Sequence, residues 1–280
     1  MSSFISSFSM KKYLIKTLLY VLPVFSLLVG VNYIGDAAKL FHNDFEKKMV
    51  NILNNGQYVT NIVNYDERVF QRELIVNMTD APKVVVLGSS RLMQITEEFL
   101  GVETMNNCVS GATIEDLIAI YQMYKSKGLI PSKFIVGIDP WVFNINNNQS
   151  RWLSVKNEYE EYLDGDSSRK YGFEILRKYE QLLSLSYFQA SVKVIDKAFK
   201  GSDLPMGTDS INNVLSTKLK DGSIVYSEVI RNSTLEQINQ RVDSYIKDEI
   251  YGLQDFEELS PLTTSIVKIF LKEIVDSQSE

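Results

Sequence analysis

The first part of the chain contains one long stretch without a charged side chain. Residues 17–34 hold no Asp, Glu, Lys or Arg, and Tyr13 to Ile15 extend the apolar pattern with only Lys16 between them. Together these residues approach the roughly 20 that an α-helix needs to cross the hydrocarbon core of a bilayer. The pattern therefore predicts a transmembrane anchor over residues 13–34.

The charges around this segment indicate its orientation. Lys11, Lys12 and Lys16 lie at its N-terminal side, whereas Asp36 follows it. Because Lys and Arg collect on the cytoplasmic side, we expect a single-pass protein of the inner (cytoplasmic) membrane with a cytoplasmic N-terminus and an extracytoplasmic domain. Two alternatives stay open. One is a signal peptide cut near residues 35–38, where Asp36 fits poorly, and the other is a buried soluble helix, although the segment is apolar on every face.

Residues 35–81 carry a weaker and more polar pattern. Apolar side chains recur at helical spacing through the first part of this segment, at Ala37, Ala38, Phe41, Phe45 and Val50. Such a period indicates an amphipathic helix. We expect these residues to form a helical stalk that lifts the following domain off the bilayer.

The pattern changes to alternating strands and helices after residue 81. Residues 83–88 and 134–138 are short, continuous apolar runs typical of strands buried on both faces, and residues 103–107 form a weaker third candidate. Between them, residues 114–127 show one apolar helical face, with Thr113 as a cap. This alternation predicts an α/β domain with a parallel sheet over residues 82–280.

The second half of this domain is less regular. Residues 145–260 predict a helical insertion with a long helix around 173–199, and Asp221-Gly222 between apolar flanks predicts a hairpin turn. A last amphipathic helix over 261–276 starts at Pro261. Three strands are few for a sheet that usually has four to six, so we expect a polypeptide truncated at its C-terminus relative to the full fold.

Composition excludes several classes of function. The chain has 280 residues, a formal net charge of −6, one cysteine and one histidine. An acidic chain without Lys/Arg clusters is a poor nucleic-acid binder. A single cysteine forms no intramolecular disulfide, and one Cys with one His cannot supply a structural zinc site. We expect no cofactor and no metal.

Gly88-Ser89-Ser90-Arg91 directly follows the first predicted strand and precedes a predicted helix. Ligands of open α/β sheets bind at this edge, and a serine hydroxyl there lies near backbone N–H groups that can stabilise an oxyanion. Glycine allows the tight turn. The alternative is a serine that only caps the next helix.

Three blocks together resemble the SGNH (GDSL-type) hydrolase superfamily, in its membrane-anchored branch of DltD-like and polysaccharide O-acetylation proteins. They are Val85 to Arg91, Asn107 to Thr113, and Gly137 to Trp141. The resemblance implies a transmembrane helix followed by an incomplete flavodoxin-like (SGNH) parallel sheet with a helical insertion. It also implies that Ser90 is the nucleophile, and that the N–H groups of Ser90 and Gly111 form the oxyanion hole.

The chain departs from this family at two positions. Asp139 stands where the family has the asparagine that completes the oxyanion hole, and a carboxylate there repels a developing negative charge. Asp139 can alternatively cap the turn before Pro140. The family's C-terminal Asp-x-x-His, which supplies the base, is missing; the only histidine, His42, lies upstream of the first strand and is expected to be a solvated stalk residue. Trp141 can line a substrate groove or belong to the core.

Two functions follow from these observations. The resemblance implies an extracytoplasmic O-acyl esterase or acetyltransferase of a bacterial cell-envelope polysaccharide, inactive in this chain if no base replaces the histidine. The alternative is a non-catalytic accessory protein that binds an envelope polysaccharide or a membrane acyltransferase.

Overall fold

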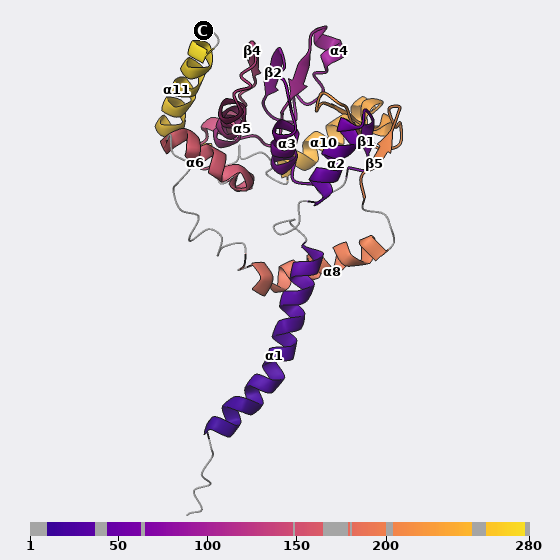
Figure 1. Cartoon of the computed structure of the whole chain (residues 1–280), viewed down its shortest axis with the longest axis vertical. Helices are drawn as coiled ribbons and strands as arrows, with labels where there is room; N and C mark the ends of the chain where they lie inside the picture. The colour runs from indigo at the N-terminus through magenta and orange to yellow at the C-terminus, as the bar shows by residue number, and fades with distance from the viewer. Residues whose placement is uncertain are drawn as a thin grey trace, which may run out of the picture. The chain divides into compact units, whose positions relative to one another are not determined.

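The computed structural model describes residues 10–36, 44–62, 65–147, 149–164, 179, 181–199, 204–247 and 256–277 (Figure 1). The chain divides into two units. The first comprises Met1–Asn43 and Lys170–Asp203, and the second comprises Asp44–Arg169 and Leu204–Glu280. His42 and most of the residues between 165 and 180 lie outside the described part of the chain.

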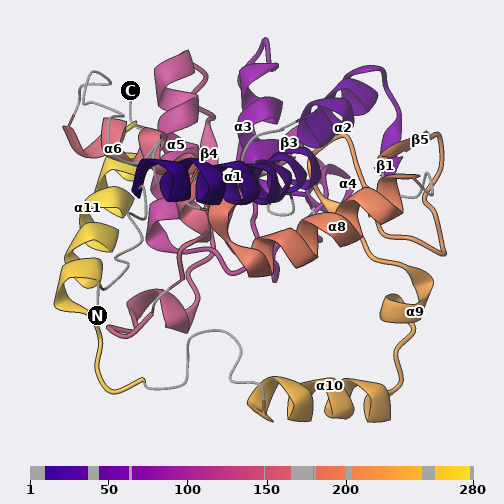
Figure 2. The same ribbon diagram turned by 90° about the horizontal axis from the view of Figure 1, so that it is seen from below.

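The first unit contains two α-helices that contact each other. Helix α1 (Met10–Gly35) includes a stretch, Tyr13–Gly35, that is long and apolar enough to cross a membrane, a test that a signal sequence also passes. Helix α8 (Leu185–Phe199), preceded by the short 3-10 helix η3 (Gln181–Leu183), lies across the C-terminal end of α1 in both views (Figures 1 and 2). It occupies the second half of the long helix expected over 173–199.

A three-stranded parallel sheet is the centre of the second unit. Its strand order is β3 (Thr104–Asn106), β2 (Val84–Leu87) and β4 (Lys133–Val136), with Val85 paired to Met105 and Phe134. All four residues of β2 are buried. Val85 and Leu87 enter one apolar cluster and Val86 another, as expected for a strand covered on both faces. The three strands predicted from the sequence are confirmed.

Helix α5 (Ile114–Lys127) covers one face of this sheet together with α11 (Pro261–Ser277) and α6 (Lys156–Asp164). Tyr121 and Phe270 pack edge to face with ring centroids 5.6 Å apart, and both are buried. Two short 3-10 helices, η1 (Pro140–Phe143) and η2 (Arg151–Val155), border the same cluster. The predicted helices over 114–127 and from Pro261 are confirmed.

A second, antiparallel sheet was not expected from the sequence. Its order is β5 (Met206–Thr208), β1 (Tyr58–Thr60), β6 (Thr217–Lys218) and β7 (Ile224–Val225). The predicted hairpin is present between β6 and β7, where Gly222 adopts a φ of +76°. Residues 145–260 therefore contain strands as well as helices, which include α9 (Glu228–Arg231) and α10 (Leu235–Lys247).

Of the residues expected to form a helical stalk, those from Asp44 onward belong to the second unit. Helix α2 (Asp44–Asn54) and helix α3 (Glu67–Val76) flank β1 and share one apolar cluster. Its buried members are Phe45, Met49, Val50, Leu53, Val59, Phe70 and Leu74. The helix expected directly after Arg91 is a series of turns that leads to the short α4 (Glu97–Leu100).

Candidate active site

The loops that follow the three parallel strands meet at one edge of the sheet. Parallel strands end on the same side, so residues 88–91, 107–111 and 137–141 come together there. Backbone hydrogen bonds join the loops directly. Val109 N donates to Gly88 O over 3.0 Å, and Gly137 N donates to Leu87 O over 2.8 Å.

Gly88 is required by the close approach of two loops. A Cβ atom at this position would lie 2.8 Å from Leu92 Cδ1 and 3.2 Å from the carbonyl oxygen of Gly137. The second contact is with backbone, which cannot move aside without breaking the strand end. The glycine therefore lets the turn after β2 pack directly against the turn after β4.

The two serines of the turn have different environments. Ser89 is buried, and its Oγ accepts a hydrogen bond from Arg91 N over 3.3 Å. Ser90 is half-buried, and within the described residues its hydroxyl makes no hydrogen bond. The Ser89 hydroxyl therefore serves as the acceptor for a backbone N–H of its own turn. The Ser90 hydroxyl, at the edge of the sheet, remains available for another hydrogen bond.

Arg91 links the turn after β2 to the loop after β4, although the sequence did not identify it as a site residue. Its Nη1 lies 3.1 Å from Asp139 Oδ1, and its guanidinium carbon lies 4.9 Å from the ring centroid of Trp141. Trp141 Nε1 in turn donates to Ala112 O over 3.0 Å. Trp141 is 3% exposed, so it belongs to the core and does not line a groove. The position of Arg91 directly after the two serines was the only signal in the sequence.

Asp139 is an ion-pair partner and not a helix cap. Its side chain is 12% exposed and makes no capping hydrogen bond to the 3-10 helix that begins at Pro140. The carboxylate faces the guanidinium of Arg91, which is 59% exposed. The negative charge expected to disturb an oxyanion at this position therefore has a positive partner within the same site.

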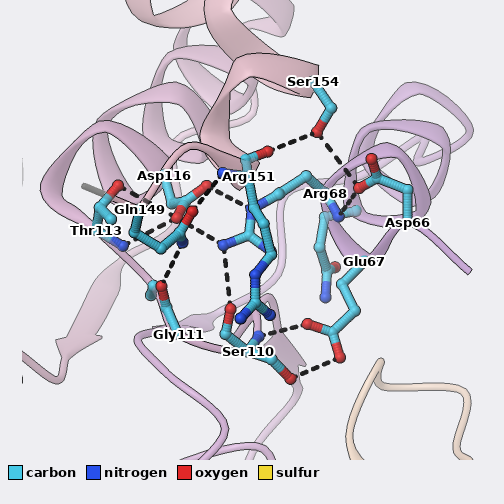
Figure 3. Close-up of polar contacts among 12 residues, drawn as sticks. Asp66, Glu67, Arg68, Ser110, Gly111, Thr113, Asp116, Gln149, Arg151 and Ser154 are labelled. Atoms are coloured by element: carbon cyan, nitrogen blue, oxygen red, sulfur yellow. Dashed lines mark hydrogen bonds and ion pairs between the residues drawn. The ribbon is translucent and has the colours of Figure 1, made fainter. Parts of the chain in front are cut away.

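Gly111 lies in a loop held from several sides (Figure 3). Its φ is +57°, a region that glycine adopts without steric cost. Gln149 Nε2 donates to Gly111 O over 2.7 Å. A Cβ at Gly111 would lie 3.6 Å from Nη2 of Arg151, whose guanidinium reaches toward Ser110 and Gly111 in Figure 3.

Ser110, next to this glycine, is bound by the start of α3. Glu67 accepts hydrogen bonds from Ser110 N and, over 2.8 Å, from Ser110 Oγ. Arg68 Nη2 donates to Ser110 O over 3.1 Å. Because Asp66 caps α3 by accepting from Arg68 N and Val69 N, the helix start is itself fixed. The loop after β3 is thus positioned by residues that precede the whole sheet in the chain.

A buried ion pair lies beneath this loop. Arg68 Nε and Nη2 contact the two carboxylate oxygens of Asp116 at 2.7 and 2.8 Å, with the side chains 3% and 0% exposed. Asp116 also accepts from Thr113 N over 2.9 Å at the start of α5. Burial lowers the pKa of Arg68, but the hydrogen bonds and charge of Asp116 outweigh it, and the pKa lies above its ordinary value.

Two other ionisable groups are buried nearby. Burial raises the pKa of the Cys108 thiol to about 12, so the thiol stays protonated at neutral pH. Burial lowers the pKa of Lys218, whose Nζ donates to Gly222 O over 2.8 Å and lies 5.3 Å from the ring centroid of Phe70. Within the described residues, no group of three or more His, Cys, Asp or Glu side chains could hold a metal ion.

The described part of the chain contains no histidine, because His42 lies outside it. The carboxylates at this edge are engaged, Asp139 with Arg91 and Glu67 with Ser110. The arrangement offers a hydroxyl, an exposed guanidinium and loop amides at the end of a buried strand, which suits a ligand with a carbonyl or an anionic group.

Ser90, Gly111 and Asp139 thus belong to three loops of the same sheet edge, and Arg91 and Trp141 connect these loops. Comparison of the chain with protein-family models, with curated proteins and with solved structures finds no match to any of them.

Proposed function

We propose that the chain is a single-pass membrane protein with an extracytoplasmic SGNH-like domain, related to O-acyl esterases and acetyltransferases of cell-envelope polysaccharide. The strand order β3-β2-β4 supports this proposal. It equals the order 2-1-3 of the first three strands in a flavodoxin-like sheet, in which ligands bind at the carboxyl edge where the strand order reverses. The Gly88-Ser89-Ser90-Arg91 turn follows the central strand at that edge.

The observation that carries the proposal is the position of Ser90, which is half-buried at the end of the central strand and directly precedes Arg91, the ion-pair partner of Asp139. In the proposed reaction, Ser90 Oγ forms a bond to the carbonyl carbon of an acyl ester, and the ester C–O bond breaks. The serine proton goes to a base and then to the leaving sugar hydroxyl, and water or a second hydroxyl removes the acyl group. Arg91 and the amides of Ser90 and Gly111 stabilise the oxyanion.

Arg91 offsets the negative charge that Asp139 brings to the site. A carboxylate at the third motif would oppose a developing oxyanion, but its pairing with a guanidinium at 3.1 Å makes the local charge close to neutral. Because Arg91 is 59% exposed, its remaining N–H groups can reach a ligand from the solvent side. The guanidinium therefore takes the place of the neutral donor that the family has there.

A second function is favoured by the sequence, which contains no Asp-x-x-His motif: its one histidine, His42, follows Lys39 at that spacing and lies upstream of β2. Without a base, a serine hydroxyl is a weak nucleophile at neutral pH, and loss of the base lowers the rate by orders of magnitude. The same edge then serves as a binding site of a non-catalytic accessory protein. Its partner is an envelope polysaccharide or a membrane acyltransferase.

A serine-directed fluorophosphonate probe separates the two functions. The full-length chain in detergent is incubated with the probe, and the labelled residue is identified by peptide mass spectrometry. The esterase proposal expects labelling of Ser90 that is lost in Ser90→Ala and retained in Ser89→Ala, the matched control. His42→Ala tests whether the only histidine is the base. If an active serine hydrolase is labelled under the same conditions and Ser90 is not, the catalytic proposal fails and the binding function is favoured.

A further inference from the structure

The last turn of α1 is bound to the segment around α8 by polar contacts. Asn32 Nδ2 donates to Leu182 O over 2.8 Å and to Ser184 O over 3.1 Å. Tyr187 Oη donates to Asp36 Oδ1 over 2.8 Å. Asn32 and Asp36 are 0% and 4% exposed. These two polar side chains are therefore buried at the end of an otherwise apolar and exposed helix.

Gly35 brings the two helices into direct contact. A Cβ at this position would lie 2.5 Å from Ser191 Cβ and 2.6 Å from Ser191 O, and Ser191 is fully buried. Any larger residue would force the helices apart, because the obstacle includes backbone. We call the contacts of Asn32, Gly35 and Asp36 with residues 182–191 the corner.

Helix α8 has an apolar row that does not belong to the corner. Successive residues turn by about 100°, so the contact residues Tyr187 and Ser191 share one side. A quarter turn away lies an apolar row formed by Leu185, Phe188, Val192 and Ile195. Leu185 is 71% and Val192 44% exposed. The polar residues Ser186, Gln189, Lys193 and Asp196 occupy the remaining side and are exposed.

We propose that α8 is a membrane-interface helix, which lies flat at the outer surface of the phospholipid bilayer and places its apolar row at the boundary of the acyl chains. This inference rests on the proposed membrane anchoring by α1. Helices with a polar face and an apolar face of this kind lie in the interfacial plane. We assign the lipid bilayer as the partner of this apolar row because the exposed apolar surface of α1 continues up to the corner. Its last member, Ile34, is 71% exposed and directly precedes Gly35.

The corner fixes the depth of α8. Since α8 contacts the last turn of α1, it lies where the span leaves the hydrocarbon and enters the headgroup region. Burial of Asn32 and Asp36 against α8 suits this level, because polar side chains in hydrocarbon are costly unless they are bonded. The sheet unit is then tethered to the bilayer surface through three connections, one after α1, one before η3 and one after α8.

Spin-label depth measurements on the full-length chain in phosphatidylethanolamine/phosphatidylglycerol nanodiscs test the proposal. In a Cys108→Ala background, single cysteines replace Val192 in the apolar row, Gln189 in the polar row, and Leu19 in α1. We expect the label at Val192 to collide several-fold less with a water-soluble nickel reagent, and more with oxygen, than the label at Gln189. The label at Leu19 reports the anchor itself.

The outcomes separate the two proposals. If Leu19 is protected from nickel but Val192 and Gln189 are equally accessible, α1 spans the membrane and the interface helix is refuted. If the label at Leu19 is also accessible to nickel, α1 does not span the membrane, and both the membrane anchoring and the interface helix are refuted. Gly35→Val should raise the nickel accessibility of Val192, whereas Gly30→Val should not, because nothing lies within 4 Å of a Cβ at Gly30. An unchanged depth in Gly35→Val would disprove the role of the corner.

Discussion

Two loops at the same edge of the parallel sheet are built in opposite ways. The loop after β3 is fixed, because Ser110 and Gly111 bond to Glu67, Arg68 and Gln149. In the turn after β2, the Ser90 hydroxyl makes no hydrogen bond within the described residues. One loop is thus held by side chains of other elements, and the other leaves its serine hydroxyl without a partner among the described residues.

This difference shows how a site can combine rigidity with reactivity. Oxyanion donors act best when they are held in place before the ligand arrives, and this requires supporting hydrogen bonds. The hydroxyl of a serine nucleophile must instead be available to donate to a general base, and so cannot be used to hold the backbone. Substitutions in the support of the β3 loop should therefore affect folding, and substitutions in the β2 turn should affect function.

The largest effect is expected for the buried pair beneath the β3 loop. Asp116→Ala leaves Arg68 as an uncompensated buried charge and removes the acceptor of Thr113 N. We expect a loss of about 3–5 kcal/mol in the free energy of unfolding, measured by urea denaturation of the full-length chain in detergent. Glu115→Ala is the matched control on the same helical turn, with a loss below about 0.5 kcal/mol.

A double substitution shows whether charge or packing causes this loss. Arg68→Met with Asp116→Leu removes both charges and keeps apolar volume. Replacement of a buried pair by apolar residues is often neutral or stabilising, so the double variant should recover most of the stability lost in Asp116→Ala. A loss of less than 1 kcal/mol in Asp116→Ala itself would show that the pair does not support the loop.

The buried thiol of Cys108 gives a smaller, pH-dependent effect. Its folded pKa of about 12 exceeds the ordinary value of 9.0, so above pH 9 the unfolded chain loses a proton that the folded chain keeps. The thiol's contribution to stability is complete below pH 9 and is lost as the pH rises toward 12. Between pH 8 and 10 the free energy of unfolding of the unchanged chain should fall by on the order of 1 kcal/mol more than that of the Cys108→Ala variant. If the free energy of unfolding depended on pH in the same way in both proteins, the thiol would not be buried.

The regular part of the second unit was predictable because its signals are local. Residues 84–87 and 134–136 are apolar runs within the strands, and residues 114–127 have a helical period with a cap at their start. The antiparallel sheet was not predictable in the same way. Its strands have only two or three residues, and β1 pairs with β5, a segment nearly 150 residues away. Such pairing leaves no periodic pattern in a single sequence.

The candidate site was predictable in location but not in its contacts. The glycine and serines after a buried strand indicate the carboxyl edge of the sheet, where the structure places Ser90, Gly111 and Asp139. The partner of Asp139 is a side chain 48 positions earlier, and the support of Ser110 comes from Glu67, 43 positions earlier. Most charged residues lie on the surface and are solvated. Nothing in the sequence therefore distinguishes Asp139 or Glu67, which have partners in the fold, from a solvated carboxylate.

The smallest effect on stability is expected at the candidate nucleophile. Ser90→Ala removes a half-buried hydroxyl that bonds to no described residue, so the free energy of unfolding should change by less than about 0.5 kcal/mol. Ser110→Ala is the matched comparison at the fixed loop. It leaves Glu67 without its hydroxyl donor, and it should cost about 1–3 kcal/mol because the lost hydrogen bond involves a charged group. Urea denaturation measures both variants under the same conditions. If Ser90→Ala destabilised the domain as much as Ser110→Ala, the hydroxyl of Ser90 would serve the fold, and its assignment as a nucleophile would lose its physical basis.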